Sequence, residues 1–295
     1  MSDTRASGAR KVPIQLKEHI VEIISDSGEG AQKCGQSLGT IAAHMDNGVW
    51  TTEIIPAEIR PTAATRRIWF IAFNEQVLLG RVRAKELKPD CIILLEDMWR
   101  TDPDASVVAS YIETHDRLVN AGYRVHEVPM ERECRTLVAD ARQGKNMFAL
   151  GMLCQLYSLH LGLAREQIIA TFGKKDQRVV DANIQLLDAG HAWAESHLDF
   201  LYVIPAKRST VPQIVVSGNT SLALGVLVSG MEVCAMYPLT PATSASHYLA
   251  EVFENVGGIV HQAEDEIAAC AFAIGASYAS KCTWHWCRVR AGTVP

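Results

Sequence analysis

A short stretch in the last third of the chain places a threonine between two prolines. Thr240 lies within Tyr237-Pro238-Leu239-Thr240-Pro241, directly after the apolar run of residues 233–236 and before a helix-like pattern. Because each proline fixes its own φ angle, the Thr240 hydroxyl would have a fixed position, and hydrogen-bond catalysis depends on such positioning. The simpler interpretation is a strand that ends in a rigid turn.

A second stretch places three acids at the start of a helix made of small residues. Glu264, Asp265 and Glu266 precede the helical segment of residues 267–279, which carries no charge. Acids in a first helical turn are common, since they complement the helix dipole. The many Ala and Gly residues behind them predict that another element packs closely on this helix. A carboxylate at such an edge could exchange a proton with a ring nitrogen.

Two further loops are candidates for binding. Ser27, Gly28 and Gly30 lie in a turn between a predicted strand and a predicted helix, where backbone N–H groups could bind a phosphate. A tight turn explains the same residues, and the acid between the two glycines would repel a phosphate. Glu58 and Arg60 lie in a proline-flanked loop that could bind an anion or pair across an interface, although an ordinary surface ion pair would look the same.

Composition excludes several classes of protein. The net charge of −5 comes from interspersed charges without a basic run, so nucleic acid is not an expected partner. No apolar run reaches the roughly 18 residues of a membrane-spanning helix, and the N-terminus does not resemble a signal peptide, so we expect a cytoplasmic protein without a membrane partner. The eight cysteines are scattered, without a C-x-x-C pair, which favours reduced thiols and no iron–sulfur cluster in this chain. Cys282, His285 and Cys287 are too few for a structural zinc site, so no metal is predicted.

The pattern of hydrophobic residues predicts an α/β fold in two parts. Strand-like runs at residues 19–24, 69–73, 91–95 and 123–128 alternate with helix-compatible sequence, and a helical region follows from 146 to about 197. Residues 205–213 gather proline and charge and are interpreted as a linker. We therefore predict a first domain over residues 12–204 and a second, partial domain over residues 214–281.

These motifs resemble one family. Together, "SGNTSLALGVLVSGMEVCAMYPLTP" and "QAEDEIAACAFAIGASYA" look like the α subunit of 2-oxoacid:ferredoxin oxidoreductases, especially the 2-oxoglutarate enzymes, nearly unbroken from residue 218 to 279. Residues 19–203, with "SDSGEGAQKCGQSLGT" and "EIIPAEIRP", resemble more loosely the γ-type domain fused ahead of it. The resemblance implies a Rossmann-like three-layer γ-type domain followed by part of a thiamine diphosphate pyrimidine-binding α/β domain.

The resemblance also implies a chemistry. Enzymes of this family oxidatively decarboxylate a 2-oxo acid with thiamine diphosphate, pass electrons through an iron–sulfur cluster to ferredoxin and the acyl group to coenzyme A, or run the reverse carboxylation. It places Glu266 opposite the aminopyrimidine ring and Thr240 in the substrate pocket as a donor to the oxo acid. Tyr237, Pro238, Pro241 and Glu264 would line that pocket. Mg²⁺ and the iron–sulfur cluster would belong to a β subunit, the expected partner.

The sequence departs from the family pattern at its end. From Cys282 onward the family's glycine-rich loop is replaced by Cys-Thr-Trp-His-Trp-Cys. Codons for these residues, read one base later, can encode a glycine-rich stretch, so a frameshift over residues 282–295 is our hypothesis. The chain would then be an N-terminal piece of an α subunit, inactive alone. Two alternatives stay open: a non-catalytic assembly or partner-binding module, and an independent nucleotide-binding α/β protein.

Overall fold

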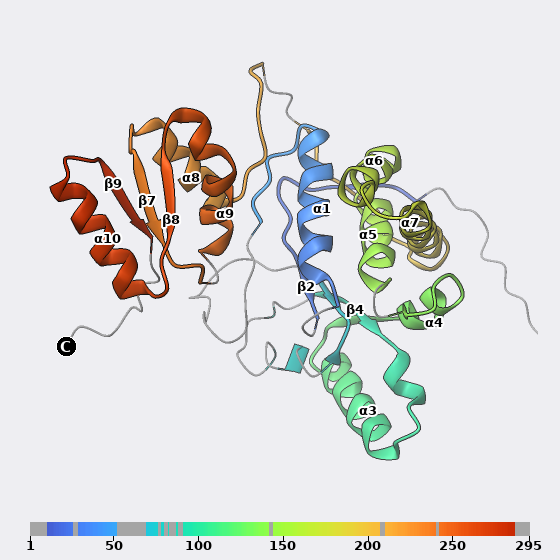
Figure 1. The fold of residues 1–295 in the computed structure, drawn as a ribbon. Coiled ribbons are helices and arrows are strands. Elements are labelled where there is room, and N and C mark those ends of the chain that lie inside the picture. Colours follow the sequence, from blue (N-terminus) through green and yellow to red (C-terminus); the bar gives the residue numbers. More distant parts are fainter. Residues whose placement is uncertain are drawn as a thin grey trace, which may run out of the picture. The chain divides into compact units, whose positions relative to one another are not determined.

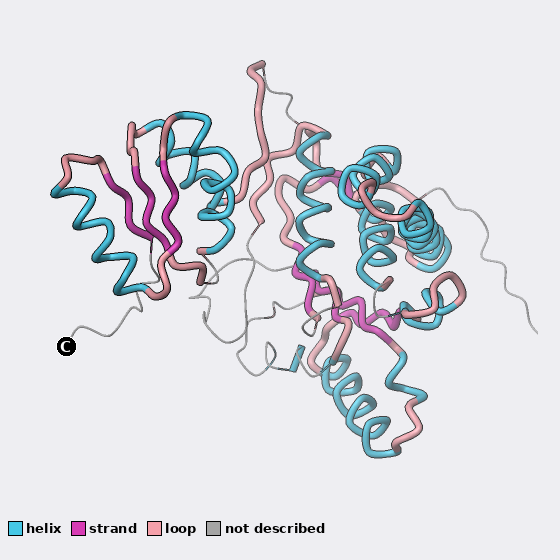
Figure 2. Tube along the Cα trace, viewed as in Figure 1, coloured by secondary structure: helices cyan, strands magenta, loops and turns pink. Residues whose placement is uncertain are grey.

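The chain forms two compact units, Met1–Val211 and Pro212–Pro295. The computed structural model describes residues 11–25, 29–51, 69–75, 78–79, 82, 87, 91–141, 144–206, 210–239 and 242–286. Figure 1 labels their helices and strands, and Figure 2 colours them by type. Each unit is described by itself, and the division between them falls within the predicted linker.

The first unit is built on a parallel sheet. Its four strands lie side by side in chain order, β2 (Val21–Ile24), β3 (Trp69–Ala72), β4 (Ile92–Glu96) and β5 (Arg124–Val128). Ile24 is paired with Ala72, and Ala72 with Leu95, so the carboxyl ends of the strands lie together at one edge. A separate parallel pair joins β1 (Ile14–Gln15) to β6 (Tyr202–Val203).

Alternating side chains of the sheet contact different helices on its two faces. Ile71 and Leu94 belong to the core formed with helices α1 (Ala31–His44), α5 (Lys145–Leu156), α6 (Leu161–Phe172) and α7 (Gln177–His197). Phe70 and Leu95 pack on the other face with Tyr111 of helix α3 (Ala105–Asn120). Because successive side chains of a strand point to opposite faces, fully apolar strands are covered on both sides. This arrangement confirms the predicted α/β fold of helices, parallel sheet and helices.

The helices of the first unit connect and cover these strands. They are α1 (Ala31–His44), the short 3₁₀ helix η1 (Met98–Thr101), α3 (Ala105–Asn120), α4 (Met130–Arg135), α5 (Lys145–Leu156), α6 (Leu161–Phe172) and α7 (Gln177–His197). Nearly every residue of α5 is buried. It crosses α7 at two glycines: a Cβ on Gly151 would lie 2.0 Å from the Leu187 carbonyl oxygen, and one on Gly190 would lie 2.0 Å from that of Phe148.

The second unit is a smaller α/β unit. Its parallel strands lie in the order β8 (Ile259–Gln262), β7 (Val233–Met236) and β9 (Thr283–Trp286). Helices α8 (Gly218–Val228) and α9 (Thr243–Val252) share a core with Cys234, and the 3₁₀ helix η3 (Phe253–Val256) adds Phe253 to that core. Helix α10 (Glu266–Tyr278) packs against β7 and β9 (Figure 1).

Three observations bear on expectations from the sequence. Strand β9 lies inside the unusual tail of residues 282–295, so the sheet of the second unit extends beyond the predicted boundary at residue 281. Six cysteines in the described part of the chain are free thiols, namely Cys34, Cys91, Cys134, Cys154, Cys234 and Cys282. Among the described helices, none combines the length and the apolar character that crossing a membrane requires.

Candidate functional site

The acidic stretch of the second unit follows strand β8 and begins helix α10. Asp265 is the N-cap residue, and its side chain accepts a hydrogen bond of 2.6 Å from the backbone N–H of Ala268. The side chain of Asp265 thus satisfies one of the free N–H groups of the helix end. Glu266 follows in the first turn, with a half-buried side chain, whereas Glu264 is exposed. In the part of the chain that the structure describes, the Glu266 carboxylate makes no hydrogen bond or ion pair.

The structure brings this stretch next to the proline-flanked turn. Strands β7 and β8 are paired with Met236 opposite Gln262, and the Ala263 N–H donates a 2.8 Å hydrogen bond to the Met236 carbonyl oxygen. Tyr237 and Pro238, both half-buried, therefore leave the sheet beside the segment that leads into Glu266. The sequence separates these residues by almost thirty positions, and parallel pairing brings them together.

The last two residues of the motif, Thr240 and Pro241, lie outside the described residues. Hydrogen bonds hold the chain in place on either side of these two residues. The Ala242 N–H bonds the Leu239 carbonyl oxygen at 2.8 Å, and the Asn219 amide of α8 donates to the Ser244 hydroxyl of α9 at 2.7 Å. The first turns of α8 and α9 therefore lie together at the carboxyl end of β7.

In the first unit, the glycine loop has a structural explanation. Ser27 and Gly28 lie outside the described residues, as do Glu58 and Arg60. Gly30 precedes α1 with φ +82°, and a Cβ there would lie 2.6 Å from the side-chain nitrogen of Asn146. Only glycine combines this left-handed backbone with so close a contact. Gly30 is therefore explained by close packing, without a bound phosphate.

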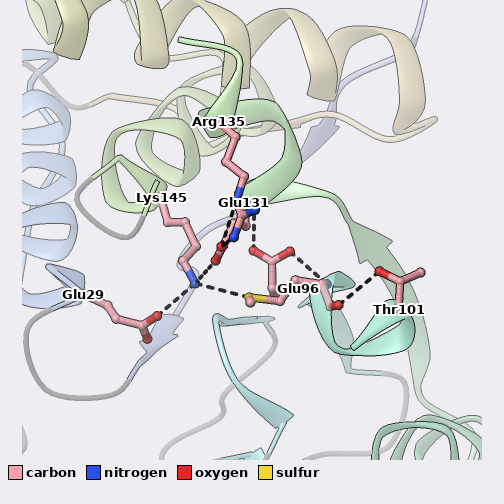
Figure 3. Close-up of polar contacts among 7 residues, drawn as sticks. Glu29, Glu96, Thr101, Glu131, Arg135 and Lys145 are labelled. Carbon is pink, nitrogen blue, oxygen red and sulfur yellow. Dashed lines mark hydrogen bonds and ion pairs between the residues drawn. The ribbon is translucent and has the colours of Figure 1, made fainter. Parts of the chain in front are cut away.

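A buried polar cluster, which the sequence did not predict, lies beside that loop (Figure 3). Lys145, at the first position of α5, is 1% exposed and pairs with Glu29 at 2.9 Å and Glu131 at 3.5 Å. Arg135 in turn donates to Glu131 at 2.6 Å. Burial alone would lower the pKa of Lys145, but the hydrogen bond that it donates to Glu29 and the charges of the three glutamates raise it above its usual value. We name these residues (Glu29, Glu96, Glu131, Arg135 and Lys145) the Lys145 cluster.

Glu96 is the most deeply buried acid of the Lys145 cluster. It is the last residue of β4 and is 0% exposed. Its two oxygens accept hydrogen bonds from the backbone N–H groups of Met98, at 3.2 Å, and Glu131, at 3.0 Å. Burial raises the pKa of Glu96 to about 7, against the opposing effects of Lys145 and these two N–H groups.

The Lys145 cluster ties together three loops at the carboxyl edge of the sheet, where α/β units often bind ligands. Its carboxylates, however, accept bonds from within the cluster and from the backbone, so the geometry favours a structural role. Among the described residues, no group of His, Cys, Asp and Glu has the arrangement of a metal site. One signal in the sequence was available: Lys145 is the single charged residue of a largely apolar helix and lies at its start.

Comparison with known proteins identifies both units. Residues 63–193 match the family model "Pyruvate ferredoxin/flavodoxin oxidoreductase", and residues 225–283 match "Pyruvate flavodoxin/ferredoxin oxidoreductase, thiamine diP-bdg". The second match contains Tyr237, Thr240 and Glu266, and it ends where the unusual tail begins.

Similar proteins carry related names. The 2-oxoglutarate oxidoreductase subunit KorA of Mycobacterium tuberculosis is 28% identical over 90% of this chain and 45% of that protein. The α subunit of 2-oxoacid:ferredoxin oxidoreductase 1 of Aeropyrum pernix is 32% identical over 47% of this chain and 23% of its own length.

A solved structure of the same family has a similar fold. The 2-oxoglutarate:ferredoxin oxidoreductase of Magnetococcus marinus, solved with 2-oxoglutarate, coenzyme A and succinyl-CoA bound, superimposes with a TM-score of 0.73 at 26% identity, over 92% of this chain and 47% of that one. The chain thus spans about half the length of the relatives that it matches end to end. Both of its units match models of this family, and one of the similar proteins is named as an α subunit, so the chain belongs to the 2-oxoacid:ferredoxin oxidoreductases.

Proposed function

We propose that the second unit forms the aminopyrimidine side of a thiamine diphosphate site in a 2-oxoacid:ferredoxin oxidoreductase. The observation that carries the proposal is the position of Glu266, in the first turn of a small-residue helix and beside the strand end that leads into the Tyr237–Pro241 motif. Its side chain is partly accessible, and no described residue bonds its carboxylate. These properties fit a carboxyl group that hydrogen-bonds a ring nitrogen of a bound cofactor.

In this function the side chains of the second unit position the cofactor and the substrate, and one of them transfers a proton. The Glu266 carboxyl group exchanges a proton with the pyrimidine ring nitrogen, and the dipole of α10 stabilises the carboxylate that remains. Thiamine diphosphate supplies, when bound, the carbon nucleophile that attacks the oxo group. Thr240 donates a hydrogen bond to the 2-oxo acid, while Tyr237 and Pro238 form the wall beside it.

Other parts of the reaction are assigned to other chains. A β subunit would hold the diphosphate, Mg²⁺ and the iron–sulfur cluster that passes electrons to ferredoxin. The described residues offer no alternative metal cluster for these groups. The substrate best supported is 2-oxoglutarate, with coenzyme A as the acyl acceptor, because the similar proteins are named for 2-oxoglutarate and the solved relative contains both molecules.

The test is to co-express the chain with a β subunit and compare Glu266→Gln with the parent complex. We expect 2-oxoglutarate-dependent dye reduction to fall by about 10² to 10⁴-fold, the usual contribution of a general acid–base group. Thiamine diphosphate binding, measured by calorimetry, should weaken as well, because one hydrogen bond loses its charge. Glu254→Gln, at an exposed position of η3, is the matched control and should leave both measurements unchanged.

Two outcomes would contradict the proposal. Unchanged activity and cofactor affinity in Glu266→Gln would show that this carboxylate does not contact the ring. A parent complex that assembles with the β subunit, yet neither binds thiamine diphosphate nor reduces the dye, would favour a non-catalytic assembly module instead.

A further inference from the structure

Helix α1 of the first unit ends in a turn that contains an asparagine followed by a glycine. Asp46 has φ +61°, in the left-handed region. The N–H groups of Asp46 and Asn47 donate to the carbonyl oxygens of Ala43, at 3.0 Å, and Ala42, at 3.1 Å, which satisfies the last carbonyl groups of the helix. Gly48 comes next, and no other asparagine of the chain is followed by glycine. The backbone of Asn47 thus belongs to the helix end, and Gly48 is the first residue beyond it.

The backbone nitrogen of Gly48 is accessible. Gly48 is exposed, and in the part of the chain that the structure describes its N–H makes no hydrogen bond. A Cβ built on Gly48 would meet nothing within 4 Å, so neighbouring residues do not restrict the backbone there. Glycine also lacks the side chain that would shield its own nitrogen. A reacting group can therefore approach this nitrogen.

The side chain of Asn47 is not held by hydrogen bonds either. Its Oδ1 atom is buried and has no donor among the described residues, and none of them bonds its Nδ2 atom. A buried oxygen without a donor has lost its contacts with water and gained no hydrogen bond in return. Rotating the amide toward Gly48 therefore breaks no hydrogen bond within the described structure.

We propose that Asn47 is a site of spontaneous deamidation. The Gly48 nitrogen attacks the Cγ atom of Asn47, and the side-chain nitrogen leaves as ammonia, which includes the proton that Gly48 loses. The product is a succinimide ring, which one water molecule then opens. Attack of water at Cγ gives aspartate, whereas attack at the backbone carbonyl carbon gives isoaspartate, whose main chain runs through Cβ and Cγ. The reaction needs no oxidant and no cofactor.

The modification should weaken the end of α1. Both products add a carboxylate next to Asp46, at a helix end where the dipole already disfavours negative charge. Beyond the turn the chain packs back on the helix, because a Cβ on Gly39 would lie 3.2 Å from Cγ1 of Val49 and 2.8 Å from Cγ2 of Thr51. Isoaspartate lengthens the main chain of the turn by a carbon atom, which shifts Val49 and Thr51 away from Gly39.

The first experiment incubates the full, folded chain at neutral and at mildly alkaline pH and follows its peptides by mass spectrometry. The peptide with Asn47 should change from amide to acid, faster at the higher pH because Gly48 must lose its amide proton. Fragmentation identifies isoaspartate by its main-chain Cα–Cβ bond. Asn120, exposed at the end of α3, is the internal control. It should keep its amide, because Ala121 follows it and donates its N–H to the Arg117 carbonyl oxygen at 3.0 Å.

The second experiment tests the structural part of the argument. Because neither reacting group is hydrogen-bonded, the folded chain should deamidate within about tenfold of the rate of the chain unfolded in urea, whereas a site that reacts only after local unfolding is slowed much more. Gly48→Ala should slow the reaction about tenfold or more, since the added side chain shields the nitrogen. The space around Gly48 accepts this Cβ, so the variant should stay folded, which circular dichroism verifies.

The third experiment measures hydrogen exchange of residues 48–51. Exchange should be faster in the incubated protein and in Asn47→Asp than in the fresh protein, and unchanged exchange in both would contradict the expected weakening of the helix end. The proposal itself is overturned if Asn47 keeps its amide while the unfolded chain loses it, if Asn120 reacts as fast, or if Gly48→Ala has no effect. Because no assay here uses the cofactor, failure would not affect the proposed enzymatic function.

Discussion

Replacing Lys145 by Met should destabilise the first unit strongly. The substitution keeps the aliphatic part of the side chain but removes the positive charge that pairs with Glu29 at 2.9 Å and Glu131 at 3.5 Å. Both partners have little access to water, with side chains 14% and 8% exposed. Their carboxylates would remain buried without the cation that compensates them.

The expected cost follows from that burial. Removing one partner of a buried ion pair costs about 3–5 kcal/mol, because an uncompensated charge is left inside the protein. At about 2–4 °C for each kcal/mol in a unit of this size, the unfolding temperature should fall by roughly 6 to 20 °C. Arg165→Met is the matched control, since its ion pair with Asp188 is about 40% exposed on both sides and is worth about 0–1 kcal/mol.

Calorimetric unfolding gives the temperatures, and hydrogen exchange of a peptide from α5 reports on the first unit alone. The double variant Lys145→Met, Glu29→Gln should recover part of the lost stability, because it removes one of the unpaired charges. If Lys145→Met costs no more than Arg165→Met, the assignment of the Lys145 cluster as a buried, charge-compensated network is wrong.

Two further predictions concern the same unit. Because the folded-state pKa of Glu96 is raised to about 7, the folded protein holds a proton that the unfolded chain has already lost, so the Glu96 contribution to stability falls as pH rises from about 4.5 to about 7. The free energy of unfolding of Glu96→Gln, measured relative to the parent protein by urea titration, should increase over this window by up to about 1.4 kcal/mol per pH unit, and a flat difference would refute the argument. Gly30→Ala should cost clearly more than Gly122→Ala in the same titration, because both glycines have positive φ but only Gly30 approaches another side chain, Asn146 at 2.6 Å. Equal losses would mean that the backbone angle alone requires glycine at position 30.

The sequence predicted the elements well, because local patterns determine them. The apolar run before Glu96 predicts a buried parallel strand, and β4 occupies it with only a one-residue shift. The helical region was also correct, although the loops that separate α5, α6 and α7 were not predicted. At the candidate site, the end of β7 was indicated by the sequence, but β8 was not, so the neighbourhood of Tyr237 and Glu266 emerged only from the structure.

Long-range contacts were not predictable in the same way. The pairing of Lys145 with Glu29 joins residues 116 positions apart, and no periodic pattern marks it. Gly30 suggested a phosphate-binding loop, because a glycine in the sequence indicates a backbone that can adopt a tight turn. The sequence does not show which side chain packs against that glycine. Asn146, which makes that close contact, lies in a helix that the pattern assigned only to the apolar core.

The order of residues in the Lys145 cluster has a consequence for synthesis of the chain. All three acids, Glu29, Glu96 and Glu131, precede the lysine in sequence. While the ribosome makes the four strands of the sheet, their carboxyl edge therefore carries negative charge without its buried cation. Helix α5 packs closely on α7, because Gly151 and Gly190 allow the two helices to touch. This packing joins parts of the chain that are near in sequence, and it brings Lys145 to that edge. The sheet of the first unit can thus reach its final stability only after the helices that follow it have been made.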